Sequence, residues 1–155
     1  MERKVRVVQF GTGKMAVYTM RYVLEKGGEV VGAIDINPNV IGKDVGPIMG
    51  QGEIGVKVTD LKDAEEMLKQ TRPDICIVET MSLLKDVEEA LMLCARLGIN
   101  AITTCEEAFF PWNSNPTVTK AIDEMAKKTG CTITGSGYQD IYWGCLLYTS
   151  PSPRD

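Results

Sequence analysis

The chain has 155 residues, of which 44% are hydrophobic and 25% charged, with a formal net charge of −4 and a sequence pI near 5.0. This length suits one domain with a sizeable core, and the acidic balance argues against a nucleic-acid-binding surface. No apolar run approaches the roughly 20 residues of a membrane span, and the N-terminus, MERKVRVV, lacks the apolar core of a signal peptide. The cysteines are scattered without a C-x-x-C pair, so we expect reduced thiols in a cytoplasmic protein. From the charge and the lack of a long apolar run we expect neither nucleic acid nor membrane as a partner.

The N-terminal stretch has the pattern of a strand–turn–helix–strand unit. An apolar run from Val5 to Phe10 stops at residues 11–16, GTGKMA, and an amphipathic segment follows. A second apolar run, 30–34, leads directly into Asp35. Residues 11–16 match the G-x-G-x-x-[GA] pattern of dinucleotide-binding turns. The sequence therefore predicts a nucleotide site where the first strand meets the first helix.

Each small residue of this turn has an expected task. Gly11 lets the chain turn sharply out of the strand, and Gly13 leaves room for a pyrophosphate beside the backbone. Ala16 lets the helix lie close to the strand, so the phosphates meet the free N–H groups at the helix start. The residues expected to bind the cofactor are Gly11, Thr12, Gly13, Lys14, Met15, Asp35, Thr80 and Thr104.

Asp35 indicates which nicotinamide cofactor is preferred. A carboxylate at the end of the second strand can accept the ribose hydroxyls of the adenosine half, and it repels a 2′-phosphate. No arginine follows it, since the next residues are Ile36, Asn37 and Pro38. The sequence therefore favours NAD over NADP, although Lys43 could weaken that preference.

The rest of the chain alternates strands and helices. We expect a glycine-spaced loop over 37–52 with a short helical turn, a helix capped by Thr59 or Asp60, and a proline-initiated helix ending at Thr129. The expected strands are 55–58, 75–78, 100–103 and 131–134, and the other expected helix is 84–97. The chain is thus predicted to be α/β, a Rossmann-type doubly wound parallel sheet of about six strands.

Four stretches, GTGKMA, IGKDVG, TTCEEAFFPW and GSGYQDIYWG, match one family in the same order. They resemble the N-terminal domain of 2,4-diaminopentanoate dehydrogenase, an amino-acid dehydrogenase of ornithine fermentation that is related to dihydrodipicolinate reductase. The resemblance implies oxidative deamination of 2,4-diaminopentanoate to 2-amino-4-oxopentanoate with NAD or NADP. It also implies a second α/β domain, absent here, that supplies much of the substrate pocket and assembles a homo-oligomer.

This chemistry calls for carboxylates, because the small-molecule diamino-acid substrate carries two ammonium groups. Without any histidine, the base would be a carboxylate, tyrosine or lysine of this segment, unless the second domain supplies it. The candidates for catalysis, all expected at strand ends near the nicotinamide, are Glu79, Glu106 and Tyr138. Glu106 and Glu107 could instead be helix-capping or surface acids. Glu79 could have no role beyond a hydrogen bond to backbone groups beside the nicotinamide. No metal site is indicated. The aromatic segment 109–112 is interpreted as core or domain-interface packing.

The last eleven residues, CLLYTSPSPRD, differ from the rest in composition. They resemble the translation of a transposon-based sequencing adapter. We therefore expect residues 1–144 to be the NAD(P)-binding domain with the start of the interdomain segment, and 145–155 to be a non-native tail. The fragment alone is then expected to be inactive. Two alternatives stay open: a dihydrodipicolinate reductase-like enzyme, and a non-catalytic NAD(H)-sensing module.

Overall fold

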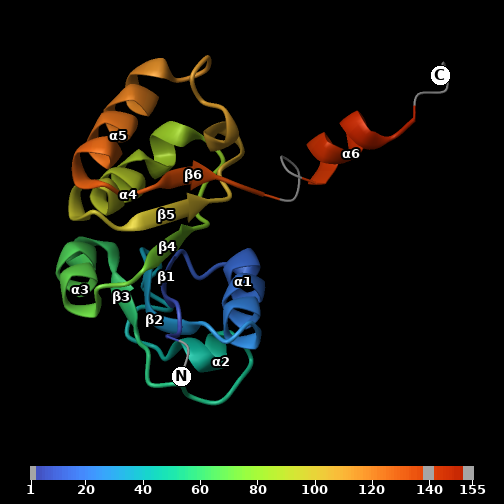
Figure 1. The fold of residues 1–155 in the computed structure, drawn as a ribbon. Helices are drawn as coiled ribbons and strands as arrows, with labels where there is room; N and C mark the ends of the chain where they lie inside the picture. The colour runs from blue at the N-terminus through green and yellow to red at the C-terminus, as the bar shows by residue number, and fades with distance from the viewer. Residues whose placement is uncertain (1–2, 138–141, 152–155) are drawn as a thin grey trace.

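The computed structural model of the chain describes residues 3–137 and 142–151, and in these residues six strands form one parallel sheet in the order β3-β2-β1-β4-β5-β6. Figure 1 shows the sheet with helices on both of its faces. The strands are β1 (Arg6–Phe10), β2 (Glu29–Asp35), β3 (Val58–Asp60), β4 (Ile75–Val78), β5 (Asn100–Thr103) and β6 (Ile133–Gly135). The prediction of a doubly wound parallel sheet is confirmed.

The helices follow the expected alternation with the strands. The α-helices are α1 (Lys14–Glu25), α2 (Val45–Ile48), α3 (Ala64–Thr71), α4 (Leu84–Leu97), α5 (Pro116–Thr129) and α6 (Gly144–Thr149). Two 3-10 turns, η1 (Leu61–Asp63) and η2 (Glu106–Phe109), precede α3 and follow β5. The bounds of α4 are those predicted, and α2 is the short helical turn expected in the 37–52 loop.

Two hydrophobic clusters cover the two faces of the sheet. One is formed by α1 and the 45–49 segment against β2 and β3, and includes Met20, Ala33 and Met49. The other is formed by α3, α4 and α5 against β1, β2, β4 and β5, and includes Phe10 and Leu91. Because strand residues alternate between faces, Val8 and Phe10 face the second cluster. Continuous apolar strands such as Ile75–Val78 are what a sheet covered on both faces requires.

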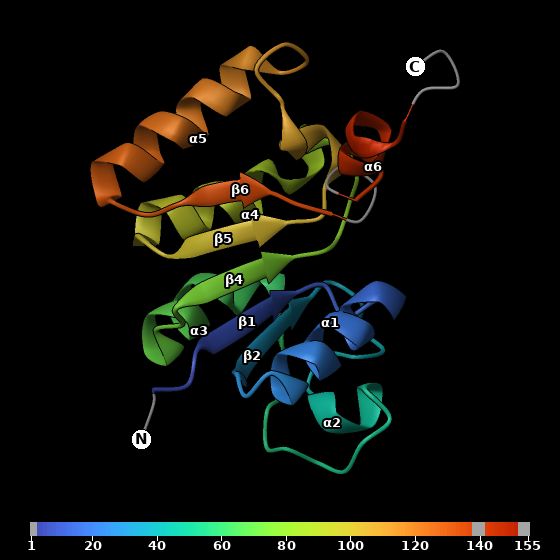
Figure 2. The same ribbon diagram turned by 45° about the vertical axis from the view of Figure 1, so that its right-hand side comes forward.

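The sheet topology places the carboxyl ends of β1 and β4, which are far apart in the sequence, next to each other at one edge of the sheet. The chain begins in the middle of the sheet with β1, moves outward to β3, and returns to place β4 on the other side of β1. Phe10 pairs with Ile34 on one side and with Val78 on the other. Ligands of open α/β sheets bind outside the carboxyl ends of the strands where the winding direction reverses. In Figure 2 the arrowheads of β1 and β4 point to this edge.

Two predicted strands begin later than expected. The strand expected over 55–58 is observed at Val58–Asp60, because the Asp44 carboxylate accepts hydrogen bonds from the N–H groups of Ile54 and Gly55 and holds that stretch in the loop. The strand expected over 131–134 is observed at Ile133–Gly135. There the Cys131 N–H donates to the Ala126 carbonyl and completes the end of α5.

Candidate nucleotide-binding site

The turn after β1 places Gly11 where only glycine fits. Its φ is 84°, in the left-handed region that other residues avoid, and its N–H donates to the Ile34 carbonyl at 2.8 Å. A Cβ added at Gly11 would lie 2.6 Å from the Glu79 carbonyl oxygen. The turn therefore packs directly against the end of β4, as the sequence predicted for a sharp exit from the strand.

Gly13 lies in a different environment. It is the N-cap of α1 with extended backbone angles, and a Cβ added there would meet no protein atom within 4 Å. No side chain caps this helix and no acidic residue lies in its first turn. By contrast, Asp44 caps α2 through the Gly46 N–H. The N-terminus of α1 thus presents uncapped N–H groups and the positive end of its dipole to open space, which suits an anion.

The other residues of the turn divide into buried and exposed ones. Ala16 is buried against β2, which confirms its expected place at the helix–strand contact. Lys14 and Met15 are exposed, and Met15 retains 67% of its accessible surface. Both are therefore free to contact a ligand at the start of α1.

Asp35 ties the end of β2 to the glycine turn. Its Oδ2 accepts hydrogen bonds from the Thr12 backbone N–H at 2.7 Å and from the Thr12 hydroxyl at 2.5 Å. Its Oδ1 accepts the backbone N–H groups of Ile36 at 2.8 Å and Asn37 at 2.9 Å. Burial raises the pKa of this carboxyl, but the hydrogen bonds outweigh it and the net pKa lies below its ordinary value. Asp35 is therefore ionised at neutral pH.

A cavity of about 350 Å³ opens between the glycine turn, the end of β2 and the start of α4. It is lined by Phe10, Gly11, Gly13, Ile34, Asp35, Ile36, Leu61, Glu79, Thr80, Met81, Asp86, Glu89 and Ala90. Its four ionisable lining residues are all acidic, and among the described residues no lysine or arginine lines it. Exposed Ile36 and Met81 give it apolar walls. The acidic charge opposes a 2′-phosphate, and the apolar walls suit a planar base.

The structure brings together most of the residues expected to bind the cofactor. Thr80 is exposed at the carboxyl end of β4 and lines the cavity next to Gly11. Thr104 is exposed at the end of β5 and lies outside the cavity lining; its N–H donates to the Val78 carbonyl at 3.2 Å. The adenosine side of the predicted site is thus compact, while Thr104 lies farther along the edge.

The Glu79 carboxylate accepts hydrogen bonds beneath the glycine turn. Its Oε2 accepts a hydrogen bond from the Gln9 amide at 2.9 Å, and its Oε1 accepts one from the Thr19 hydroxyl at 2.8 Å. Gln9 is fully buried, and in the described part of the chain its Oε1 is a buried side-chain oxygen without a hydrogen-bond partner. Glu79 therefore joins β1, α1 and β4 under the glycine turn, a role that the sequence interpretation did not assign to it.

Replacing Glu79 with alanine is expected to lower the free energy of unfolding by about 2 kcal/mol. The buried Gln9 amide then keeps only the Phe10 carbonyl, at 3.3 Å, as an acceptor, and the Thr19 hydroxyl loses its hydrogen bond to Glu79. Glu79→Gln, which keeps one side-chain oxygen, should lose less. The measurement is urea unfolding followed by circular dichroism, with the midpoint and slope compared among the three proteins. An alanine variant as stable as the parent would contradict this bonding role.

The two acidic residues that follow β5 differ in their contacts. Glu106 is exposed in η2, whereas Glu107 Oε2 accepts the Leu84 N–H at 2.6 Å and thereby caps α4. This backbone hydrogen bond, together with one from the Ser114 side chain, holds the pKa of Glu107 below its ordinary value. The helix-capping alternative therefore describes Glu107. Tyr138, the third catalytic candidate, lies outside the described residues.

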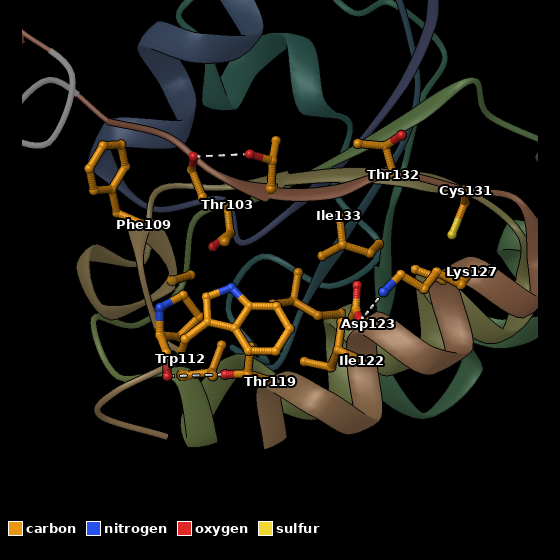
Figure 3. Close-up of a pocket in the computed structure, with 17 residues that line it drawn as sticks. Thr103, Phe109, Trp112, Thr119, Ile122, Asp123, Lys127, Cys131, Thr132 and Ile133 are labelled. Carbon is orange, nitrogen blue, oxygen red and sulfur yellow. Dashed lines mark hydrogen bonds and ion pairs between the residues drawn. The ribbon is translucent and has the colours of Figure 1, made fainter. Parts of the chain in front are cut away.

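A second cavity, of about 340 Å³, lies between β6, α5 and the segment after η2. In Figure 3 the Trp112 indole projects over α5 toward Ile122, beside the ion pair of Lys127 and Asp123 at 2.7 Å. Trp112 remains 46% exposed, and Phe109 and Phe110 are exposed too. These aromatic residues are therefore not core in this chain, and their interpretation as a domain interface stays a prediction.

Sequence reasoning missed Gln9, which lies beneath the glycine turn, and two acidic residues that line the cavity. Gln9 was detectable as the polar residue inside the apolar run of β1, but its pairing with Glu79 depends on the β1–β4 neighbourhood. Glu89 and Asp86 border the cavity from α4, where no candidate residue was predicted. The i, i+3 spacing of these two acids places them on one helix face, which is the signal that could have identified them.

The fold and the cleft define a Rossmann-type dinucleotide-binding domain. None of the helices in the described residues is long and apolar enough to span a bilayer. No family model matches the chain. The chain superposes on an amine dehydrogenase from Mycobacterium smegmatis with a TM-score of 0.88 and 39% sequence identity, covering 97% of this chain and 46% of that one.

Two curated proteins resemble the chain in sequence. It is 27% identical over 140 residues to 2,4-diaminopentanoate dehydrogenase of Acetoanaerobium sticklandii, covering 86% of this chain and 38% of that protein. It is 31% identical over 101 residues to 4-hydroxy-tetrahydrodipicolinate reductase of Methanothermobacter thermautotrophicus, covering 63% and 36% respectively. The chain therefore spans less than half the length of these relatives, and it is similar to the NAD(P)-binding domains of such dehydrogenases and reductases.

Proposed function

We propose that the chain is the cofactor-binding part of an NAD-dependent dehydrogenase that oxidatively deaminates 2,4-diaminopentanoate to 2-amino-4-oxopentanoate. The observation that supports cofactor binding best is the uncapped start of α1, with the open space at Gly13 and the ionised Asp35 facing one cavity. The likeness to 2,4-diaminopentanoate dehydrogenase supports the choice of reaction. A second domain that completes the substrate pocket and mediates homo-oligomerisation belongs to the proposal.

The residues of this chain would hold the cofactor in parts. The N–H groups at the start of α1 would bind the diphosphate, Asp35 the adenosine ribose, and the apolar walls formed by Ile36 and Met81 the adenine. The bound nicotinamide supplies hydride transfer. Because the cleft contains carboxylates and no described cation, the preferred cofactor is NAD.

The substrate would lie farther along the sheet edge. A diammonium substrate is attracted by exposed carboxylates, and Glu106 in η2 is an exposed acidic residue after β5. Glu79 is the weaker candidate for direct contact with substrate, because both its oxygens already accept hydrogen bonds from Gln9 and Thr19. Glu106 is therefore the described residue that we propose to hold a substrate ammonium group.

One rival reaction has its own observation. The 31% identity to a 4-hydroxy-tetrahydrodipicolinate reductase over 101 residues favours a reductase with the same cofactor domain. Its anionic substrate would require cationic groups, and none of the described residues that line the cavity is cationic. We therefore place the deaminating dehydrogenase first.

The test is a kinetic comparison on the full-length protein from which this domain derives. NAD reduction with 2,4-diaminopentanoate, and faster turnover with NAD than with NADP, would support the proposal. Oxidation of a reduced cofactor by 4-hydroxy-tetrahydrodipicolinate would assign the reductase instead. Tight NAD binding without turnover of either substrate would indicate a sensing module, and an absence of NAD binding would contradict the cofactor assignment.

A further inference from the structure

The Asp35 carboxylate already has a full set of donors. An ionised carboxylate offers about four acceptor positions, and here four N–H or O–H groups occupy them: two on Oδ2 from Thr12, and one each on Oδ1 from Ile36 and Asn37. A ribose brings two further hydroxyl donors. The ribose can therefore bind Asp35 only if a present donor leaves.

Only one of these donors can move without changing the backbone. Three of them are main-chain N–H groups, held by the turn and by the end of β2. The fourth is the Thr12 hydroxyl, which rotation about χ1 can withdraw from Oδ2. Thr12 is only 7% exposed, so its hydroxyl rather than bulk water fills this position on the carboxylate.

We propose that the Thr12 hydroxyl stands in for a ribose hydroxyl on Asp35 and is exchanged for it when a nucleotide with a free ribose diol binds. The inference rests on the proposed function and adds a specificity-determining residue to it. The exchange replaces one hydroxyl donor by another, so the carboxylate keeps its hydrogen bonds. A 2′-phosphate replaces one of the two ribose hydroxyl donors and leaves only the 3′-hydroxyl, beside a charge that the carboxylate repels. The exchange therefore favours the NAD class over the NADP class.

Thr12→Val isolates this role. Valine keeps the volume and the backbone N–H of residue 12 but removes the hydroxyl. The Asp35 carboxylate then has one hydrogen-bond donor fewer in the free protein, and a bound ribose hydroxyl supplies that donor. Stability and affinity should then change in opposite directions. A merely structural role would lower both together. Thr12→Ser, which keeps a hydroxyl at the same place, is the matched control.

The experiment is isothermal titration calorimetry of NAD, ADP-ribose and NADP on the 155-residue chain and its two variants, with thermal unfolding of each. For Thr12→Val we expect NAD and ADP-ribose to bind about three- to tenfold more tightly, NADP to bind unchanged, and the unfolding midpoint to fall. Thr12→Ser should match the parent in all of these.

Unchanged or weaker NAD binding by Thr12→Val would overturn the inference, as would an equal gain for NADP. If Thr12→Val does not fold, Thr12→Ala is measured in the same way and decides by the same criteria. A parent chain that binds neither NAD nor ADP-ribose contradicts the proposed function itself. A parent that binds both, with a valine variant that binds no better, contradicts the role of Thr12 alone.

Discussion

Replacing Gly13 with valine is expected to abolish dinucleotide binding while leaving the fold intact. The Cβ position of Gly13 faces open space at the start of α1, so the new side chain would occupy the volume needed by the diphosphate. We expect NAD affinity to fall by about a hundredfold or more. The free energy of unfolding should change by about 1 kcal/mol or less, the range of an N-cap substitution.

In contrast to Gly13→Val, Gly11→Ala is expected to destabilise the fold, and it is therefore the natural comparison. Its Cβ would lie 2.6 Å from the Glu79 carbonyl oxygen, at a φ of 84°. Backbone strain of this kind costs about 1 to 3 kcal/mol, and the close contact with the Glu79 carbonyl adds to this cost. Calorimetric titration and urea unfolding of both variants measure the two effects separately. Tight NAD binding by Gly13→Val would contradict the binding of the diphosphate at this turn.

Replacing Asp35 with alanine is expected to weaken NAD binding about tenfold or more, because a ribose loses a charged hydrogen-bond acceptor. Binding of NADP should weaken less or strengthen, since the charge that repels the 2′-phosphate is removed. The ratio of the two dissociation constants is the measurement. Asp60→Ala is the control: Asp60 is paired with Asp35 in register across β2 and β3, but it does not line the cavity. Equal ratios in the parent and in Asp35→Ala would contradict the assignment.

The same carboxylate predicts a pH dependence. Its pKa in the folded chain is lowered, so its hydrogen bonds add stability above the pKa of the unfolded chain, and this contribution is lost as pH falls through the folded pKa. Stability and NAD affinity should therefore be flat around neutrality and fall together only in acid. Glu79, Asp86 and Glu89 also line this cavity, so Asp35 is not its only carboxylate. The difference between the parent and Asp35→Asn isolates the share of Asp35.

The segments that the sequence predicted well are those governed by local rules. Apolar residues at helical spacing predicted α4, and Gly98 in the left-handed conformation ends it, as expected for a C-terminal glycine. The turn at Gly11 and the buried Ala16 followed from the spacing of small residues. By contrast, β3 was displaced because Asp44, eleven residues before Gly55, holds that stretch in the loop. Such a side-chain bond across a loop has no periodic signature.

The sequence by itself determined the alternation of strands and helices, the position of the glycine turn and the acid that ends the second strand. Each of these depends on neighbours a few residues apart. Only the tertiary structure decided the hydrogen-bond partners of the candidate acids: Glu79 with Gln9 and Thr19, Glu107 with the start of α4, and Asp35 with Thr12. These bonds join residues up to 70 positions apart. They form because the parallel sheet brings the carboxyl ends of its strands to one edge, and the order of strands along that edge is not written in any single segment.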